Sequence, residues 1–143
     1  MRSIRFRDPA GAIREGKEAA AGIEFGGEVY DPMEVDVLPP VEPSKIVCIG
    51  LNYADHAAER GKAVPDRPLL FLKAPNTVAG HGDTVSLPEG KDRVDHEAEI
   101  GIVIGEQCRH VDEAEAWDVV EGFTCVNDVS NRDDQNREQN WVR

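Results

Sequence analysis

The residues VDHEAEIGIVIG, positions 94–105, join closely spaced carboxylates to an apolar segment. This alternation predicts a β-strand, in which successive side chains point to opposite faces. Glu97 and Glu99 then share one face with Asp95, Gly101 and Val103. The opposite face carries His96, Ala98, Ile100, Ile102 and Ile104. Because that second face is mostly apolar, we expect it to pack in the core.

The two glutamates raise a question of charge. Neighbouring carboxylates repel each other, and partial burial raises the pKa of at least one of them unless a cation or a proton lies between them. A bound cation is therefore one interpretation of Glu97 and Glu99. The alternative is the solvated edge of an antiparallel strand in an acidic protein.

The composition is that of an acidic chain about the size of one domain. A chain of 143 residues can bury roughly two-thirds of its unfolded surface. Asp and Glu total 28 against 16 Lys and Arg, which gives a net charge of −12. Such a surface repels nucleic acids and anionic lipids, so we expect neither as a partner. Arg outnumbers Lys by 11 to 5, and with the acidic surface this favours a protein adapted to high salt, which screens self-repulsion.

The cysteines and the N-terminal sequence indicate a cytoplasmic protein. Cys48, Cys108 and Cys125 form no CxxC pair and are odd in number, so we expect reduced thiols that pack in the core. The first residues contain no apolar segment of signal-peptide length. No stretch approaches the ~20 apolar residues of a membrane span.

Short apolar segments separated by turn residues predict an α+β fold that is predominantly β. Residues 1–43 are expected to form a small N-terminal β module that ends in a proline-rich linker, and residues 44–143 a second domain. Further strands are predicted within residues 45–50, 67–75, 80–90 and 123–128.

Helices are predicted over residues 52–61, 111–123 and 130–141. The second is the strongest prediction, because Asp112 and Glu115 fit a capping box and Gly122 is a suitable end. Ser130 is the expected N-cap of the third helix.

Carboxylates at the strand ends suggest a metal site. Asp128 follows the predicted strand 123–128, and together with Glu97 and Glu99 it would provide the oxygen ligands that Mg²⁺, Mn²⁺ and Ca²⁺ prefer. Mg²⁺ held by few carboxylates keeps several waters, which a chelating substrate can displace.

His56 and Glu59 are three residues apart and would share one face of the first predicted helix. A glutamate in this position can orient the histidine and raise its basicity. The alternative is a solvated surface pair without a catalytic role.

Four motifs occur in the order found in the fumarylacetoacetate hydrolase family, and the chain resembles that family over residues 44–143. The motifs are GLNYADHAAE, PLLFLKAPNTVAGHGDTVSLP, VDHEAEIGIVIG and VNDVSNRDDQ. Four ordered motifs are more specific than any one of them. The resemblance implies a β-rich mixed sandwich or roll, usually dimeric, and the segment before it is similar to the small N-terminal domain of many prokaryotic members.

The resemblance also implies roles for individual residues. The implied metal ligands are Glu97, Glu99 and Asp128, the residues that activate water are His56 and Glu59, and the substrate-binding residues are Arg132, Gln135 and Lys73. The implied metal is Mg²⁺ or Mn²⁺. A surface or structural role for Lys73 is an open alternative.

The reaction implied is metal-dependent hydrolysis of a carbon–carbon bond in a β-diketo acid of the fumarylacetoacetate or acylpyruvate type. The metal would stabilise the departing enolate while water deprotonated by His56 attacks the other carbonyl. The same enolate would serve an isomerase or decarboxylase of keto-enol dicarboxylic acids in aromatic catabolism, of the 2-hydroxyhepta-2,4-diene-1,7-dioate type.

An inactive metal-binding fragment is the third alternative. Relatives in the family continue into a segment with a catalytic Lys and a Pro-Gly-Pro turn, whereas this sequence ends at Arg143. We therefore expect a C-terminally truncated member that leaves strand edges exposed and is unstable or associates in isolation.

Overall fold

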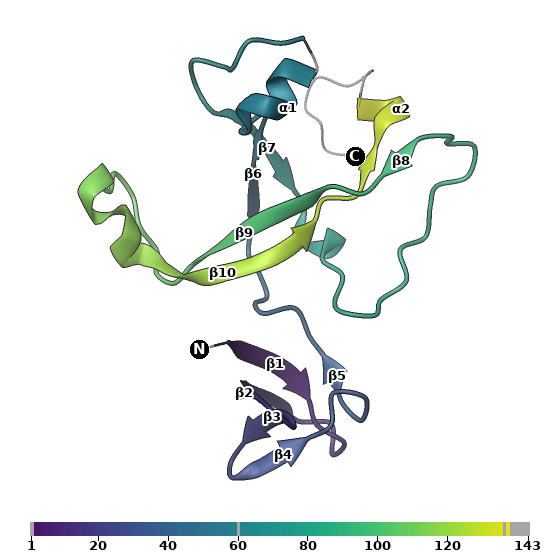
Figure 1. Ribbon diagram of the computed structural model, residues 1–143, viewed down its shortest axis with the longest axis vertical. Helices are drawn as coiled ribbons and strands as arrows, with labels where there is room; N and C mark the ends of the chain where they lie inside the picture. Colours follow the sequence, from purple (N-terminus) through teal and green to yellow (C-terminus); the bar gives the residue numbers. More distant parts are fainter. Residues whose placement is uncertain (1, 60, 136, 138–143) are drawn as a thin grey trace. The chain divides into compact units, whose positions relative to one another are not determined.

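The computed structural model describes residues 2–59, 61–135 and 137, and most of its regular structure is short strands (Figure 1). The expected α+β fold class with a predominance of β-structure is confirmed. The chain divides into two compact units. Unit 1 consists of Met1–Glu42, Ala79–Ser86 and His96–Asp128, and unit 2 of Pro43–Val78, Leu87–Asp95 and Val129–Arg143. The assignment of residues 1–43 as a separate domain stays a prediction.

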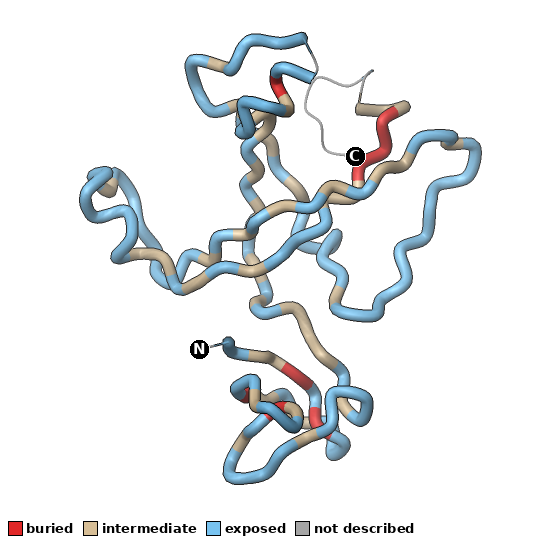
Figure 2. Tube along the Cα trace, in the orientation of Figure 1, coloured by how far each residue is buried: buried red, intermediate tan, exposed pale blue. Residues whose placement is uncertain are grey.

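The N-terminal part of unit 1 is a five-stranded antiparallel sheet in the order β4-β3-β2-β1-β5. Its strands are β1 (Ser3–Arg7), β2 (Ile13–Ala19), β3 (Gly22–Phe25), β4 (Glu28–Tyr30) and β5 (Asp36–Val37). Buried segments occur within this sheet (Figure 2). Phe6 and Ile23 are buried, and the Phe6 ring lies 5.2 Å from the Tyr30 ring between centroids. These five strands therefore form one small sheet within residues 3–37.

The second part of unit 1 is an antiparallel hairpin of β9 (Ala98–Ile104) and β10 (Val120–Asn127). A 3-10 helix, η2 (Glu113–Val119), precedes β10. The helix predicted over residues 111–123 is confirmed only for the 3-10 helix: Asp112 makes no side-chain capping hydrogen bond, and the end predicted at Gly122 is wrong because the strand begins at Val120. The physical reason is that the β-branched pair Val119 and Val120 bonds to β9 instead, with the Gly105 N–H donating to the Val119 carbonyl at 2.9 Å.

The described residues of unit 2 form two short sheets, two short α-helices and one 3-10 helix. Its elements are β6 (Ile46–Gly50), α1 (Ala54–Glu59), β7 (Leu69–Lys73), η1 (Pro75–Thr77), β8 (Val94–Asp95), β11 (Ser130–Asn131) and α2 (Arg132–Gln135). β6 pairs with β7 and β8 with β11, both antiparallel. The predicted strands within residues 45–50 and 67–75 and the helix within residues 52–61 are confirmed.

Two smaller predictions are wrong. Residues 80–90 form turns and a loop without a strand. The segment contains several Gly residues and a Pro, which favour turns, and few apolar residues. The last helix begins at Arg132 rather than after a Ser130 cap, since Ser130 belongs to β11. Asn131 occupies the cap instead, its Oδ1 accepting the Asp133 N–H at 3.1 Å. The predicted continuation to residue 141 lies largely outside the described residues.

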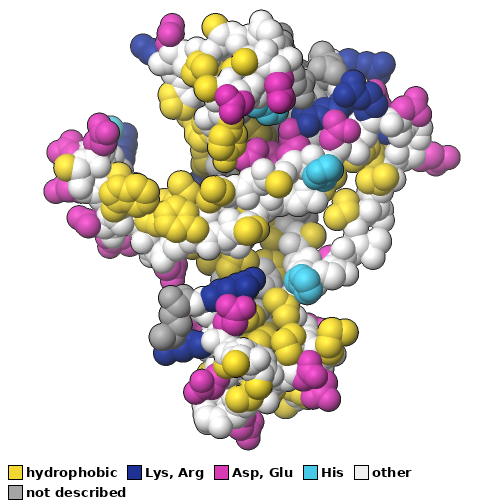
Figure 3. Space-filling model, in the orientation of Figure 1, with side chains coloured by type: hydrophobic (Ala, Val, Ile, Leu, Met, Phe, Trp, Pro, Cys, Tyr) yellow, Lys and Arg dark blue, Asp and Glu magenta, His cyan; other side chains and the backbone are white. Residues whose placement is uncertain are grey.

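The apolar face of β9 does not lie in a core. Ile100, Ile102 and Ile104 are 67%, 56% and 55% exposed, so the expectation that they pack inside is wrong for this chain. In the described part of the chain, no side chain covers them enough to bury them. Figure 3 shows hydrophobic side chains gathered over the hairpin. Among the cysteines expected in the core, Cys48 is half-buried, and the two others, Cys108 and Cys125, are exposed.

No helix in residues 2–59, 61–135 and 137 has the length and apolar character needed to cross a membrane.

Replacing Phe6 with Ala tests the N-terminal core. Phe6 is fully buried, so truncation to Ala should destabilise the sheet by about 3 kcal/mol. Amide hydrogen exchange in β1–β4 measures this loss. Val29→Ala is the matched control, because Val29 belongs to the same sheet and is 54% exposed. Equal loss of protection in the two variants would contradict the assigned core.

Candidate functional site

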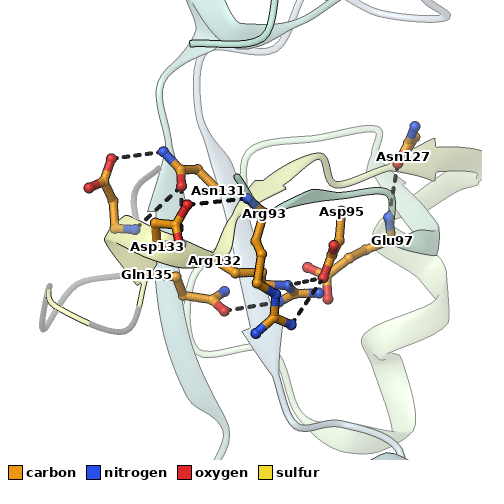
Figure 4. Close-up of polar contacts among 9 residues, drawn as sticks. Arg93, Asp95, Glu97, Asn127, Asn131, Arg132, Asp133 and Gln135 are labelled. Atoms are coloured by element: carbon orange, nitrogen blue, oxygen red, sulfur yellow. Dashed lines mark hydrogen bonds and ion pairs between the residues drawn. The ribbon is translucent and has the colours of Figure 1, made fainter. Parts of the chain in front are cut away.

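The β9–β10 ladder brings the main chains of two predicted metal ligands together at one end of the hairpin. Ala98 pairs with Asn127, and just beyond this pair the Asp128 N–H donates to the Glu97 carbonyl at 2.8 Å. The Glu97 N–H in turn donates to Asn127 Oδ1 at 3.0 Å (Figure 4). Glu97 and Asp128 therefore lie beside each other. Glu99, two residues along β9, shares the face of Glu97 by strand alternation.

The three carboxylates occupy the less exposed face of the hairpin end. Glu97 and Glu99 are half-buried, whereas Ala98 and Ile100 beside them are exposed. Asp128 is also half-buried, and its Oδ1 atom is shielded from solvent. A solvated strand edge would instead present its carboxylates on the more exposed face.

The donor set suits a hard divalent cation in its chemistry. All three side chains offer carboxylate oxygens, the ligands that Mg²⁺, Mn²⁺ and Ca²⁺ prefer. Among the described residues, however, no group of three or more His, Cys, Asp or Glu side chains stands in an arrangement that could hold a metal ion. The residue types therefore fit a metal ion, whereas the described side chains do not form a site for one, and ligation by these residues stays a prediction.

The short helix α1 carries the predicted catalytic pair in unit 2. His56 is half-buried and Glu59 is exposed, one turn later on the same helix. Ala57 is buried between them, and its N–H donates to the Tyr53 carbonyl at 3.1 Å. Burial of Ala57 fixes the orientation of the helix, while the catalytic role of the pair stays a prediction.

Arg132 is firmly held in unit 2 and contacts the other predicted substrate residue on α2. Its side chain is 9% exposed. Nε donates to Asp95 Oδ2 at 2.9 Å, and a terminal guanidinium N–H donates to Gln135 Oε1 at 2.9 Å (Figure 4). The Arg132 main-chain N–H also donates to the Arg93 carbonyl at 2.8 Å. The structure thus brings together Arg132 and Gln135, as expected from their shared helix face.

Asp95 is the partner of Arg132 that sequence reasoning missed. Its carboxylate also lies 3.9 Å from the guanidinium of Arg93. A second carboxylate, on Asp133, accepts the main-chain N–H groups of Asp92 and Arg93 at 3.0 and 3.2 Å, which ties α2 to the segment before β8. Asp95 continues the alternation of Glu97 and Glu99, but no spacing in the sequence indicates that it meets a residue 37 positions away.

Lys73 makes a structural contact in unit 2. Its side chain is half-buried, and Nζ donates to the Val129 carbonyl at 3.3 Å. This contact favours the structural alternative for Lys73, and its role in substrate binding stays a prediction.

Comparison with known sequences identifies a family. Residues 45–143 match the model of the fumarylacetoacetate (FAA) hydrolase C-terminal domain. An uncharacterized protein of Archaeoglobus fulgidus is 44% identical over 138 residues, which cover 92% of this chain and 55% of the relative. A fumarylacetoacetate hydrolase domain-containing protein 2 homolog of Dictyostelium discoideum is 46% identical over 105 residues, 72% of this chain and 34% of that protein. The chain therefore spans about half or less of these two relatives.

Comparison with solved structures identifies the same family. A 5-carboxymethyl-2-hydroxymuconate delta-isomerase from Mycobacterium smegmatis matches with a TM-score of 0.83 and 31% identity, over 100% of this chain and 60% of that one. A fumarylacetoacetate hydrolase from Exiguobacterium antarcticum matches with a TM-score of 0.79 and 26% identity, over 99% and 60% of the two chains. Enzymes of this family generally use divalent metal ions. With its family model, its β-rich fold and its ordered motifs in agreement, the chain belongs to the fumarylacetoacetate hydrolase family.

Proposed function

We propose that this protein is a divalent-metal-dependent hydrolase that cleaves a carbon–carbon bond in β-diketo acids of the fumarylacetoacetate or acylpyruvate type. The observation that carries the proposal is the hydrogen bond between Asp128 and Glu97 at the end of the β9–β10 ladder, with Glu99 two residues away. Family membership and the fumarylacetoacetate hydrolase from Exiguobacterium antarcticum support the reaction type. Because the chain spans about half of its relatives, the substrate and activity of the whole enzyme belong to the proposal.

Glu97, Glu99 and Asp128 are the proposed ligands of Mg²⁺, with Mn²⁺ or Ca²⁺ as alternatives. Such an ion, when bound, supplies positive charge that polarises the oxygens of a keto acid. Three carboxylates close together also provide the negative charge that a divalent cation requires of its ligands.

The proposed roles of the other residues concern water and substrate. His56 takes a proton from the hydrolytic water, and Glu59 orients the imidazole. Arg132 and Gln135 bind oxygen atoms of the keto acid by donating hydrogen bonds. Lys73 is a further candidate for substrate binding. The homodimer implied by the family resemblance is likewise a proposal.

The contacts of Arg132 support a binding role for this residue. A guanidinium can recognise a carboxylate only if it is held in a fixed orientation, and the carboxylate of Asp95 and the amide oxygen of Gln135 provide that orientation. Because Gln135 Oε1 accepts from Arg132, the amide nitrogen of Gln135 remains the group suited to donate to a substrate oxygen.

An isomerase is the second candidate function, and solved structures favour it. A 2-hydroxyhepta-2,4-diene-1,7-dioate isomerase from Mycobacterium marinum matches this chain with a TM-score of 0.82 and 30% identity, close to the values for the isomerase from Mycobacterium smegmatis. Isomerisation and decarboxylation of a keto acid need the same stabilisation of negative charge on the substrate oxygens. Product analysis with each substrate type distinguishes these reactions.

Glu97→Gln tests the proposed metal ligands. We expect isothermal titration to show that the wild-type chain binds Mg²⁺, and that it binds oxalate, a mimic of the chelating keto acid, only when Mg²⁺ is present. The substitution removes one carboxylate charge and should weaken Mg²⁺ binding by roughly tenfold or more.

Glu121→Gln is the matched control, because Glu121 lies on the same hairpin and is exposed. Equal Mg²⁺ affinity in the two variants would contradict the ligand assignment. Mg²⁺ binding that does not promote oxalate binding would support the inactive metal-binding fragment instead.

Asp95→Ala tests the support of Arg132. The substitution leaves the buried guanidinium without its Nε acceptor, while the Asp95 side chain itself is 42% exposed, so we expect a loss of roughly 1–2 kcal/mol. Amide exchange at Ser130 and Arg132 should accelerate accordingly. Asp92→Ala, at an exposed position nearby, removes a carboxylate but keeps the main-chain hydrogen bond to Asp133. If both variants exchange at the wild-type rate, Asp95 does not hold Arg132 in place.

A further inference from the structure

Arg93 lies directly opposite Arg132 at the end of the β8–β11 ladder in unit 2. The ladder pairs Val94 with Asn131, and one step further the Arg132 N–H donates to the Arg93 carbonyl at 2.8 Å. Opposite residues of an antiparallel pair place their side chains close together, and like charges in such a pair repel each other. The fold therefore sets two guanidinium groups near each other.

One carboxylate oxygen is near both guanidinium groups. Asp95 Oδ2 accepts from Arg132 Nε at 2.9 Å, and it lies 3.9 Å from a terminal nitrogen of Arg93 (Figure 4). The second distance is too long for a hydrogen bond. The carboxylate of Asp95 therefore binds Arg132 and only weakly attracts Arg93.

The two carboxylates of α2 nearest in sequence bond elsewhere. Asp133 Oδ2 accepts the main-chain N–H groups of Asp92 and Arg93, and Asp134 Oδ1 accepts from Lys91 Nζ at 2.7 Å. Within residues 2–59, 61–135 and 137, the Arg93 side chain has no hydrogen-bond acceptor. Its N–H groups are therefore suited to an acceptor on a ligand.

The main chain of Arg93 is fixed although its side chain is exposed. Its N–H donates to Asp133 Oδ2 at 3.2 Å, and its carbonyl accepts from Arg132. The side chain is 65% exposed. A guanidinium is a planar fork of N–H donors that matches the two oxygens of a carboxylate. Arg93 thus offers an accessible carboxylate-binding group on an anchored backbone.

The charge of the whole chain makes such a group useful. A net charge of −12 repels an anionic ligand from most of the surface. A solvated arginine alone indicates no site, but Arg93 lies opposite Arg132, whose nearly buried side chain has a proposed role in binding the keto acid. Two guanidinium groups at one point supply the local positive charge that a carboxylate requires.

We propose that Arg93 is a further substrate-binding residue, and that its guanidinium and that of Arg132 together bind one carboxylate group of the keto acid. The identity of the ligand rests on the proposed function. The test uses no metal and no reaction, so the two proposals can fail separately.

Acetate is the probe, because it carries a single carboxylate. The Nε–Hε signals of arginine are recorded for the ¹⁵N-labelled 143-residue chain during an acetate titration, at constant ionic strength and without divalent metal. We expect the signals of Arg93 and Arg132 to shift together and to saturate in the millimolar range. Acetamide, the uncharged analogue, should shift neither signal.

Variants assign the contact to the Arg93 side chain. Arg93→Gln keeps the main-chain bonds to Asp133 and Arg132 and should weaken acetate binding, read at Arg132 Nε, by roughly tenfold. Arg93→Lys keeps the charge without the fork and should recover part of the affinity. Arg67→Gln is the matched control, since Arg67 is exposed, belongs to unit 2 and changes the net charge equally.

The control should bind acetate as the wild type does, and amide signals of residues 130 and 131 report whether each variant retains the β8–β11 ladder. Two results would overturn the proposal. One is the absence of a saturable shift at Arg93, and the other is equal acetate affinity in Arg93→Gln and the wild type. A saturable response in a chain that fails to bind Mg²⁺ and oxalate would support the carboxylate site while contradicting the metal-dependent function.

Discussion

The antiparallel pairing of β9 with β10 is the constraint on which the candidate metal site depends. It sets the main chain of Asp128 beside that of Glu97 and leaves Glu99 on the same face. A shift of the register by one residue would move Glu99 opposite a different partner and reverse which side chains face the interior. The register irregularity between Val120 and Gly122 lies at the other end of the ladder, so the pairing next to the carboxylates is regular.

In unit 2, side-chain hydrogen bonds hold together β8, β11 and α2, the last of which carries Arg132 and Gln135. β8 and β11 are each two residues long, too short for ladder hydrogen bonds alone to stabilise them. Side chains of α2 and β11 add the missing bonds: Asp133 accepts from the backbone before β8, and Asp134 accepts from Lys91 at 2.7 Å and from Asn131 at 2.8 Å. These carboxylates, adjacent in the RDDQ segment, hold Arg132 and Gln135 in place and explain why so polar a segment is ordered.

The parts of the fold that follow from local pattern are predictable, and those that follow from long-range pairing are not. Alternation of side chains predicts β9, and compact apolar runs between Gly and Pro predict β6 and β7. The same local information extends the predicted helix to residue 123, whereas η2 ends at Val119, because the pairing of Val120 with Ile104 cannot be seen in the nearby sequence. The link between Asp95 and Arg132 is missed for the same reason.

The prediction that the apolar face of β9 is buried is wrong for a different reason. A period of two correctly separates the carboxylate face from the isoleucine face, but it does not say which polypeptide covers each face. The expectation that Ile100, Ile102 and Ile104 are buried assumes that the residues given contain the covering layer. Their exposure shows that the described residues do not supply it, while the motifs that identify the family are unaffected.

Paramagnetic broadening by Mn²⁺ most directly tests whether the end of the β9–β10 ladder is a metal site. The method records which backbone amide signals of the ¹⁵N-labelled chain lose intensity at low Mn²⁺ concentration. The account predicts the greatest loss at residues 97–101 and 126–129, around Glu97, Glu99 and Asp128. Loss centred instead on the acidic residues 112–118, with signals at residues 97–101 unchanged, would contradict it.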